Sequence, residues 1–382
     1  MKILMLSIFA PHFFNWTEQL KDSGYEVYWF DIFDSNTRVE QIDFVEQIIG
    51  WRYKWNYPCR YRLKKNAPAL TGFINIFNER DFQKHLEKQI EKIEPDVIHS
   101  FVMYLSGVPA LPVMKKFPHI KWVYSSWGSD MYYYQRQPEH LEGMRKTLPY
   151  MDYMFADCQR DYNLAKSHGF KGKFMGVFPG GGGFDSKVFD SYIKRQESRN
   201  IILIKGYQGL HGKCISVLEA VQKLEKYLKS YSIVVFGAPQ EVFEYVETRS
   251  LKDFTNLQVY GKIPQQKLIE LMGQSLIYIG NSSSDGIPNT LLEAIVMGIF
   301  PIQSNPGGAT AEIIEHKKNG LIITNWENIN EISNLLLEAI KNQSLREKAI
   351  TWNLINVKPR LKREELKNKV LKKYKLIESE IK

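Results

Sequence analysis

Short apolar runs alternate with segments of helical period through the first half of the chain. The apolar runs predict strands over residues 2–9, 26–30, 96–100, 122–126 and 153–156. The segments between them predict helices over residues 15–24, 81–93, 109–117, 141–150 and 159–168. Because strands that alternate with helices form parallel sheets covered on both faces, this half predicts a doubly wound α/β fold.

The second half begins with a β-branched strand over residues 201–204. The strand runs into a glycine-containing loop that carries Lys205 and Lys213 and then opens a helix. Two ammonium groups on one loop can approach a diphosphate from two sides. Both could instead be ordinary surface lysines.

A further apolar strand, at 275–280, leads into a Gly-Pro loop and another helix. Asn289 or Thr290 can cap this helix at its start, and Gly298 ends it. The free amides and the positive dipole at the start of such a helix favour an anion in the preceding loop. The pattern therefore predicts an anion-binding loop.

Two carboxylates, Asp285 and Glu293, flank this loop eight residues apart. We expect Asp285 on the loop and Glu293 in the first helical turn. Acids at this spacing also occur by chance, and Glu293 could be only a solvent-facing acid that the dipole favours. The surrounding strands and lysines favour a site for a phosphorylated sugar over a chance pair of acids.

Together these motifs resemble the C-terminal donor domain of family 4 retaining glycosyltransferases with the GT-B fold, over roughly residues 200–325. The resemblance implies that Glu293 binds the ribose hydroxyls of the donor and that Asp285 contacts the hydroxyls of its sugar. It implies phosphate contacts for Lys205 and Lys213. It also implies donor contacts for Gly206 and for the loop residues and amides that follow Asp285, namely Gly286, Ile287, Pro288, Asn289 and Thr290.

Two residues of this region depart from the family pattern. The first acid is usually Glu and here is Asp285, one methylene shorter, which leaves the identity of the transferred sugar open. The first basic residue is commonly Arg and here is Lys205, a point charge without the bidentate fork of a guanidinium.

The first half contains a second, weaker resemblance. Residues 127–130, Trp-Gly-Ser-Asp, follow a predicted strand and resemble the acceptor-side motif of the same family, which is usually written around His-Gly. Trp127 replaces the histidine, so no histidine role carries over. Asp130 is kept as a catalytic candidate, and a plain helix cap is its alternative role.

The length predicts two domains, because 382 residues with 44% apolar side chains exceed one ordinary core. Four glycines at 180–183 and a polar run at 194–200 favour a boundary there, as a hinge, a cleft loop or both. We expect a Rossmann-like acceptor-side domain over 1–180, a linker over 181–200 and a Rossmann-like nucleotide-sugar-binding domain over 201–360. In the resembled fold, a final helix over 361–382 packs back on the first domain.

The function that the resemblance implies is transfer of a sugar from a nucleotide diphosphate sugar to a glycan or lipid-linked acceptor. It implies a hexosyltransferase-type enzyme that retains configuration, uses no cofactor and needs no metal. Bacterial envelope or capsular polysaccharide synthesis is the expected setting. Two alternatives share this scaffold: a sugar-nucleotide epimerase, and a non-catalytic protein that binds a sugar nucleotide or an anionic glycan.

The net charge of +9, with a pI near 9.1, calls for an anionic partner. Basic and aromatic residues interleave most densely over residues 51–65, where no acid occurs. Such a segment favours an anionic membrane surface or an anionic acceptor. A solvated amphipathic loop is the main alternative, and nucleic acid is the least favoured partner.

Three widely spaced cysteines without a Cys-x-x-Cys pair argue against a zinc site and against a disulfide-rich secreted fold. The first nine residues are too short for a signal peptide. No apolar run reaches the roughly 18 residues that a membrane-spanning helix needs. We therefore expect a cytoplasmic protein that can lie peripherally on the inner face of the cell membrane.

Overall fold

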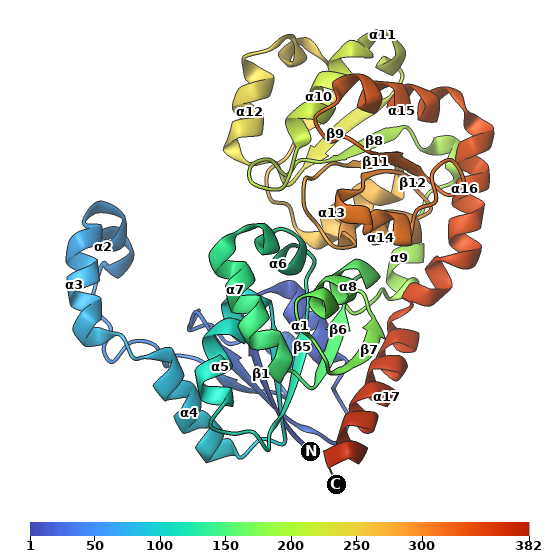
Figure 1. Cartoon of the computed structure of the whole chain (residues 1–382). Coiled ribbons are helices and arrows are strands. Elements are labelled where there is room, and N and C mark those ends of the chain that lie inside the picture. Colours follow the sequence, from blue (N-terminus) through green and yellow to red (C-terminus); the bar gives the residue numbers. More distant parts are fainter. Residues whose placement is uncertain (382) are drawn as a thin grey trace. The chain divides into compact units, whose positions relative to one another are not determined.

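The computed structural model describes residues 1–381. Lys382, the last residue of the predicted final helix, lies outside the described residues, as does the side chain of Tyr61 in the basic segment. The chain divides into two compact units (Figure 1). Unit 1 comprises Met1–Ala156, Leu164–Gly176 and the chain from Val370 onward, and unit 2 comprises Asp157–Asn163 and Val177–Lys369.

Unit 1 is built on a seven-stranded sheet with the order β3-β2-β1-β4-β5-β6-β7. Its pairs from β3 through β6 are parallel. The strands are β1 (Lys2–Ser7), β2 (Glu26–Asp31), β3 (Glu46–Ile48), β4 (Val97–Phe101), β5 (Lys121–Ser125), β6 (Tyr153–Ala156) and β7 (Lys173–Val177). The sequence predicted five of these strands and missed β3 and β7, which are exposed or only partly buried over most of their length.

The helices of the first half are α1 (Pro11–Glu18), α2 (Arg60–Asn66), α3 (Pro68–Asn78), α4 (Phe82–Ile93), α5 (Val108–Met114), α6 (Ser129–Tyr132), α7 (Pro138–Thr147) and α8 (Gln159–Ser167). A five-residue π-helix, Met103–Gly107, precedes α5. The helix predicted over 15–24 is misplaced. Pro11 starts α1 at its first position, where a missing N–H costs nothing, and the chain leaves the helix before Asp22, which has a positive φ.

Unit 2 is built on a six-stranded sheet with the order β10-β9-β8-β11-β12-β13, in which every neighbouring pair is parallel. The strands are β8 (Ile201–Lys205), β9 (Ser232–Phe236), β10 (Leu257–Val259), β11 (Ser275–Gly280), β12 (Phe300–Ser304) and β13 (Leu321–Ile323). The helices are α9 (Ser186–Tyr192), α10 (Cys214–Lys223), α11 (Glu225–Leu228), α12 (Gln240–Glu247), α13 (Gln265–Gly273), α14 (Asn289–Val296), α15 (Ile329–Lys341), α16 (Gln343–Asn356) and α17 (Arg363–Ile381), which continues into unit 1.

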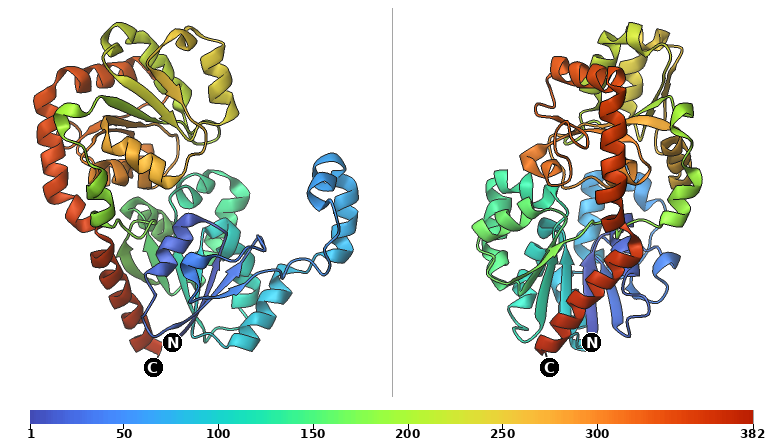
Figure 2. Two further views of the ribbon diagram at one scale, coloured as in Figure 1. Left: turned by 180° about the vertical axis from the view of Figure 1, so that it is seen from behind. Right: turned by 90° about the vertical axis from the view of Figure 1, so that its right-hand side faces the viewer.

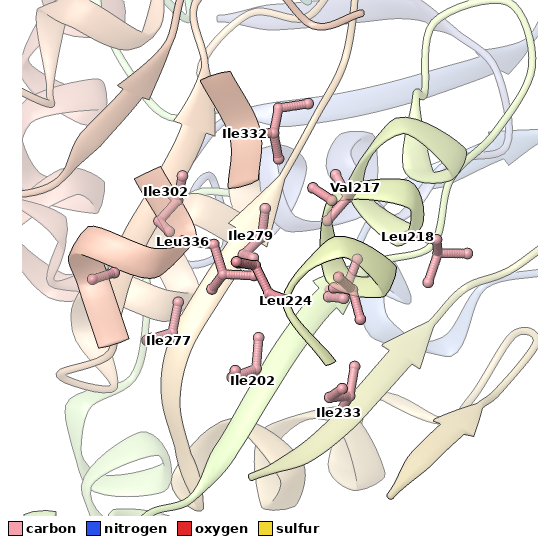
Figure 3. Packing of buried hydrophobic residues seen from close by; sticks show 14 of the residues in the cluster. Ile202, Val217, Leu218, Leu224, Ile233, Ile277, Ile279, Ile302, Ile332 and Leu336 are labelled. Atoms are coloured by element: carbon pink, nitrogen blue, oxygen red, sulfur yellow. The ribbon is translucent and has the colours of Figure 1, made fainter. Parts of the chain in front are cut away.

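Alternate residues of the unit 2 strands enter two different apolar clusters. Ile202 and Ile204 of β8 join the cluster that α10 and α15 cover (Figure 3), and Ile201 and Leu203 join the other cluster. Since successive side chains of a strand point to opposite faces, helices cover the sheet on both sides. Both units therefore have the doubly wound parallel architecture that the sequence predicted.

The last part of α17 packs within unit 1 through Tyr374. This tyrosine is fully buried, and its hydroxyl lies 2.6 Å from His99 Nδ1 and accepts a bond from Trp16 Nε1 at 3.3 Å. His99 Nε2 lies 2.8 Å from the Ser125 hydroxyl. Burial lowers the pKa of His99 to about 3, so the ring is neutral and both of its nitrogens are bonded.

No helix within residues 1–381 combines the length and the apolar character needed to cross a membrane.

Replacing Tyr374 by Phe should lower the free energy of unfolding by about 1–3 kcal/mol, because the buried His99 and Trp16 nitrogens lose their partner. Urea unfolding measures this change. Tyr227→Phe is the matched control; because Tyr227 is an exposed tyrosine of α11, that change should stay within about 0.5 kcal/mol. Equal unfolding curves for the two variants would contradict the role given to Tyr374.

Candidate functional site

The candidate site lies where the strand order of the unit 2 sheet reverses. β8 pairs with β9 on one side and with β11 on the other, and the chain continues from β11 to β12 in the opposite direction across the sheet. In open parallel sheets, ligands bind beyond the carboxyl ends of the strands at such a switch point. Lys205 ends β8, and the loop with Asp285 follows β11.

Lys205 and Asp285 meet at this switch point. The Lys205 ammonium lies 3.4 Å from Asp285 Oδ2, and it also lies 4.8 Å from the centre of the Tyr207 ring. Burial alone would lower the pKa of Lys205, but Asp285, Tyr278 and Tyr207 outweigh it and raise the pKa above its ordinary value. The lysine therefore stays charged although little of its side chain is exposed.

Glu293 lies beside them in a water-poor position. Its carboxylate accepts a bond from Gln265 Nε2 at 2.8 Å. Burial raises the pKa of Glu293 to about 7, and the Gln265 bond and the Lys205 charge offset part of this rise. The structure corrects the expectation of a first-turn acid: α14 begins at Asn289, directly after Pro288, so Glu293 falls in the second turn and is buried.

The start of α14 also differs from the predicted cap. Pro288 occupies the capping position, and its side chain makes no capping hydrogen bond. The Thr290 hydroxyl lies 2.8 Å from the hydroxyl of buried Tyr278 instead. Pro288 therefore supplies no cap to the first helical turn, and the amides and positive dipole at a helix start suit an anion.

Two residues expected to contact a donor cannot donate a backbone bond to it. Pro288 has no N–H, so the run of amides after Asp285 is interrupted there. The Gly206 amide already donates to Phe236 O at 2.7 Å. A Cβ at Gly206 would lie 2.7 Å from the same oxygen, so the glycine lets the loop after β8 lie close to β9.

Gly286 and its neighbours shape the loop itself. The Gly286 amide donates to Asp285 Oδ1 at 3.0 Å, and a Cβ at Gly286 would collide with the Asp157 carboxylate. Ile287 is buried in the apolar cluster that contains Leu291. The loop before α14 is thus held by the packing of Ile287 in the apolar cluster and by the bond from the Gly286 amide to Asp285.

Lys213 is placed by the loop that follows β11. Its amide donates to Asn281 O at 3.0 Å, and Asn281 Nδ2 donates back to Lys213 O at 3.1 Å. The Lys213 ammonium lies 3.5 Å from Gly209 O of its own loop. Asn281 therefore does more than end a strand, since it joins the two loops that carry the candidate residues.

Arg160 is a further residue that the sequence did not single out. It belongs to the 157–163 segment of unit 2, and its guanidinium donates to Asp285 O at 2.9 Å and to Pro306 O at 2.7 Å. Asp161 accepts from the same guanidinium at 2.7 Å. The sequence signal for this residue is limited to an Arg directly before an Asp, and its partners Asp285 and Pro306 are distant in the chain.

Asp130 lies in unit 1, whereas the residues described above belong to unit 2. Its carboxylate accepts from the amides of Met103 and Trp127, at 2.9 and 2.8 Å, and from the Tyr124 hydroxyl at 2.6 Å. These bonds join the loops that follow β4 and β5, next to Val102, which has a positive φ that β-branched residues rarely adopt. The bonds give Asp130 a structural role, and a catalytic contact stays a prediction.

Models of two protein families match the chain. Residues 189–352 match the family described as glycosyl transferases group 1, and residues 2–160 match the family described as glycosyl transferase 4-like. The chain belongs to the group 1 glycosyltransferases. No curated protein sequence matches it.

This glycosyltransferase also resembles solved structures over nearly its whole length. A glycosyltransferase from Rickettsia africae ESF-5 is 16% identical, with a TM-score of 0.68 and 98% of each chain covered. Sucrose-phosphate synthase from Thermosynechococcus elongatus is 15% identical, with a TM-score of 0.76 and 99% of each chain covered. Anabaena HepE in complex with UDP and glucose is 15% identical, with a TM-score of 0.68 and coverage of 98% of this chain and 99% of that one. The fold is GT-B, so the predicted family and fold class are confirmed.

The buried carboxyl of Glu293 makes the stability of the ligand-free glycosyltransferase depend on pH. The folded protein holds this proton to about pH 7, whereas an unfolded Glu loses it near its ordinary pKa of 4.5. The free energy of unfolding should therefore fall as pH rises between these values, by about 3 kcal/mol from this group. Glu293→Gln removes that contribution, so its stability relative to the wild type should rise across the same window and then level off.

Urea unfolding at several pH values from about pH 4.5 to pH 8 measures this difference. Glu364→Gln, which changes an exposed acid of α17, should follow the wild-type curve in parallel. If Glu293→Gln also runs parallel to the wild type, Glu293 is not the buried acid described above.

Proposed function

We propose that this glycosyltransferase moves a sugar from a nucleoside diphosphate sugar to a glycan or lipid-linked acceptor, with retention of configuration and without a metal ion. The observation that carries the proposal is the convergence of Lys205, Asp285 and Glu293 at the switch point, next to the start of α14. Residues 201–360 would bind the donor and residues 1–180 the acceptor, with 181–200 as the linker.

Each residue of the site suits one part of such a donor. The Glu293 carboxylate would accept bonds from the two ribose hydroxyls, which would replace the water that burial excludes. Lys205 and Lys213 would neutralise the diphosphate, together with the amides of Ile287 and the first turn of α14. Asp285, part of which is exposed, would accept from hydroxyls of the sugar.

The reaction would break the bond between the anomeric carbon and the diphosphate oxygen and form a bond from that carbon to the acceptor oxygen. Negative charge grows on the departing oxygen, and the lysines and amides stabilise it in place before the reaction begins. The acceptor attacks from the face that the diphosphate leaves, and the departing phosphate oxygen takes the acceptor proton. No enzyme carboxylate is required behind the anomeric carbon.

The comparisons support the donor class and the setting. The Anabaena structures hold UDP, UDP with glucose, or UDP-glucose, and another similar structure is a lipopolysaccharide outer core galactosyltransferase, 14% identical with a TM-score of 0.66. They make a uridine diphosphate sugar the first donor to test. The outer core galactosyltransferase also supports the setting that we propose, envelope or capsule polysaccharide synthesis.

A panel of UDP, GDP and ADP sugars should contain a donor that raises the melting temperature, since a ligand of the native state stabilises it. With that donor, free nucleoside diphosphate should appear only when an acceptor is added, and EDTA should not change the rate. NMR of the product should show the anomeric configuration of the donor. Inversion of the configuration at carbon 2 of the sugar, without an acceptor, would identify an epimerase. Tight binding of the sugar nucleotide without any turnover would identify a binding protein.

Lys213→Ala should lower kcat by roughly a hundredfold, because one preorganised donor to a developing anion is worth about 3 kcal/mol. Its side chain makes only a long contact to a backbone oxygen, so the fold should be kept. Lys226→Ala, a change on neighbouring α11, is the control and should keep the wild-type rate. Wild-type transfer by Lys213→Ala would show that the diphosphate lies elsewhere.

A further inference from the structure

Helix α3 presents apolar side chains to solvent. Its eleven residues, Pro68–Asn78, include no charged side chain. The exposed fractions are 51% for Leu70, 62% for Phe73, 72% for Ile76 and 57% for Phe77. Exposed apolar patches of this kind mark an interaction surface.

The polar residues of α3 are turned inward. Thr71 and Asn78 are its buried residues, which is the reverse of a helix that packs on a core and faces water. Thr71 Oγ1 donates to Ala67 O at 3.3 Å, and the Asn78 amide exchanges two bonds of 2.9 Å with the backbone of Trp55. The arrangement is therefore built for an apolar medium outside the helix.

A short stem holds α2 and α3 together as a hairpin, which Figure 2 draws joined to the rest of unit 1 by two chain segments. The Lys54 amide donates to Asn78 O at 2.9 Å, and the Arg80 amide donates to Arg52 O at 2.7 Å. Arg52 also forms an ion pair with Glu79. We call residues 52–80 the α2–α3 hairpin.

The charge of the hairpin has one sign over most of its length. Between Glu46 and Glu79 the chain has no acidic residue and six basic ones. Four of the six are exposed, Lys54, Arg62, Lys64 and Lys65. Apolar side chains next to such cations are typical of segments that lie in the headgroup region of anionic bilayers.

We propose that the α2–α3 hairpin docks this glycosyltransferase on an anionic lipid bilayer. Leu70, Phe73, Ile76 and Phe77 enter the apolar boundary, and the basic residues contact the headgroups. The proposal goes beyond the transfer reaction, which does not itself require this surface. A second copy of the chain fits less well because two cationic hairpins would repel, and a glycan offers no apolar partner for Leu70 or Ile76.

The structure also corrects the segment that the sequence indicated, 51–65. Trp51 is buried and Arg52 belongs to the stem, so the start of that segment does not face a partner. The apolar contact comes from α3, which lies beyond the predicted segment.

The exposed Cys59 at the start of α2 allows a direct test, because Cys158 and Cys214 are buried. An environment-sensitive dye on Cys59 should report transfer to an apolar medium when vesicles of phosphatidylcholine and phosphatidylglycerol are added. Vesicles of phosphatidylcholine alone should give a much weaker signal. In co-sedimentation, the unlabelled protein should likewise bind the vesicles that contain phosphatidylglycerol more strongly than vesicles of phosphatidylcholine alone.

Two pairs of variants separate the apolar and the charged contributions. Phe73→Ser with Ile76→Ser should weaken vesicle binding at least tenfold, since the burial of each side chain is lost. Leu354→Ser with Ile355→Ser, on α16, is its control. Lys64→Gln with Lys65→Gln should weaken binding by about fivefold for each charge, and Lys369→Gln with Lys372→Gln, on α17, should not.

Several outcomes would overturn the proposal. These are equal retention on both kinds of vesicle, no retention on either, or a signal from a single-stranded oligonucleotide but not from vesicles. A dimer that Phe73→Ser with Ile76→Ser converts to a monomer would assign the surface to a second copy. Vesicle binding is measured without donor. A failure to bind any donor would therefore count against the proposed function and would not affect the proposal that the α2–α3 hairpin docks on a bilayer.

Discussion

The parallel pairing of β8 with β11 is the contact on which the candidate site depends. Its register places Ile204 opposite Ile279, so the two strands end side by side although their loops are far apart in sequence. The helices that follow run back along the sheet from this edge, and the two loops lie together beyond it. Lys205 and Asp285, 80 residues apart, can form an ion pair only because of this pairing. Asn281 and Arg160 then fix the loops against each other and against the loop that follows β12.

The burial of charged side chains sets both the chemistry of the site and its cost in stability. Asp285 keeps Lys205 protonated, so a cation is available for a diphosphate where burial alone would tend to remove it. Glu293 has no comparable cation of its own, and its carboxylate is destabilised while the site is empty. In the proposed function, bound ribose hydroxyls would supply hydrogen-bond donors to this carboxylate, so part of the affinity for a donor would come from relief of this unfavourable state. Such a site would trade stability for recognition, a common arrangement at functional positions.

Local pattern and a few ordered motifs were enough to predict the family, the fold class and the central strands, because β-branched runs between helical segments determine a parallel sheet. The predicted starts of α1 and α14 were wrong because prolines determine both. Pro11 is the first residue of α1, and Pro288 directly precedes the first residue of α14. The burial of Glu293 and the bridge made by Arg160 depend on neighbours distant in sequence, which no periodicity reveals. The inverted face of α3 was missed for the same reason, since its buried Asn78 bonds to the backbone of Trp55 and not to a core.

Unit 1 is not contiguous in the chain, because its buried Tyr374 is separated from the rest of it by nearly all of unit 2. During translation, the pocket formed by Trp16, His99 and Phe155 remains open until the ribosome has synthesised every strand of the second sheet. The half of the protein that is made first is therefore the half that is finished last. In a nascent chain, these three aromatic side chains would lack their Tyr374 partner for the whole of that interval.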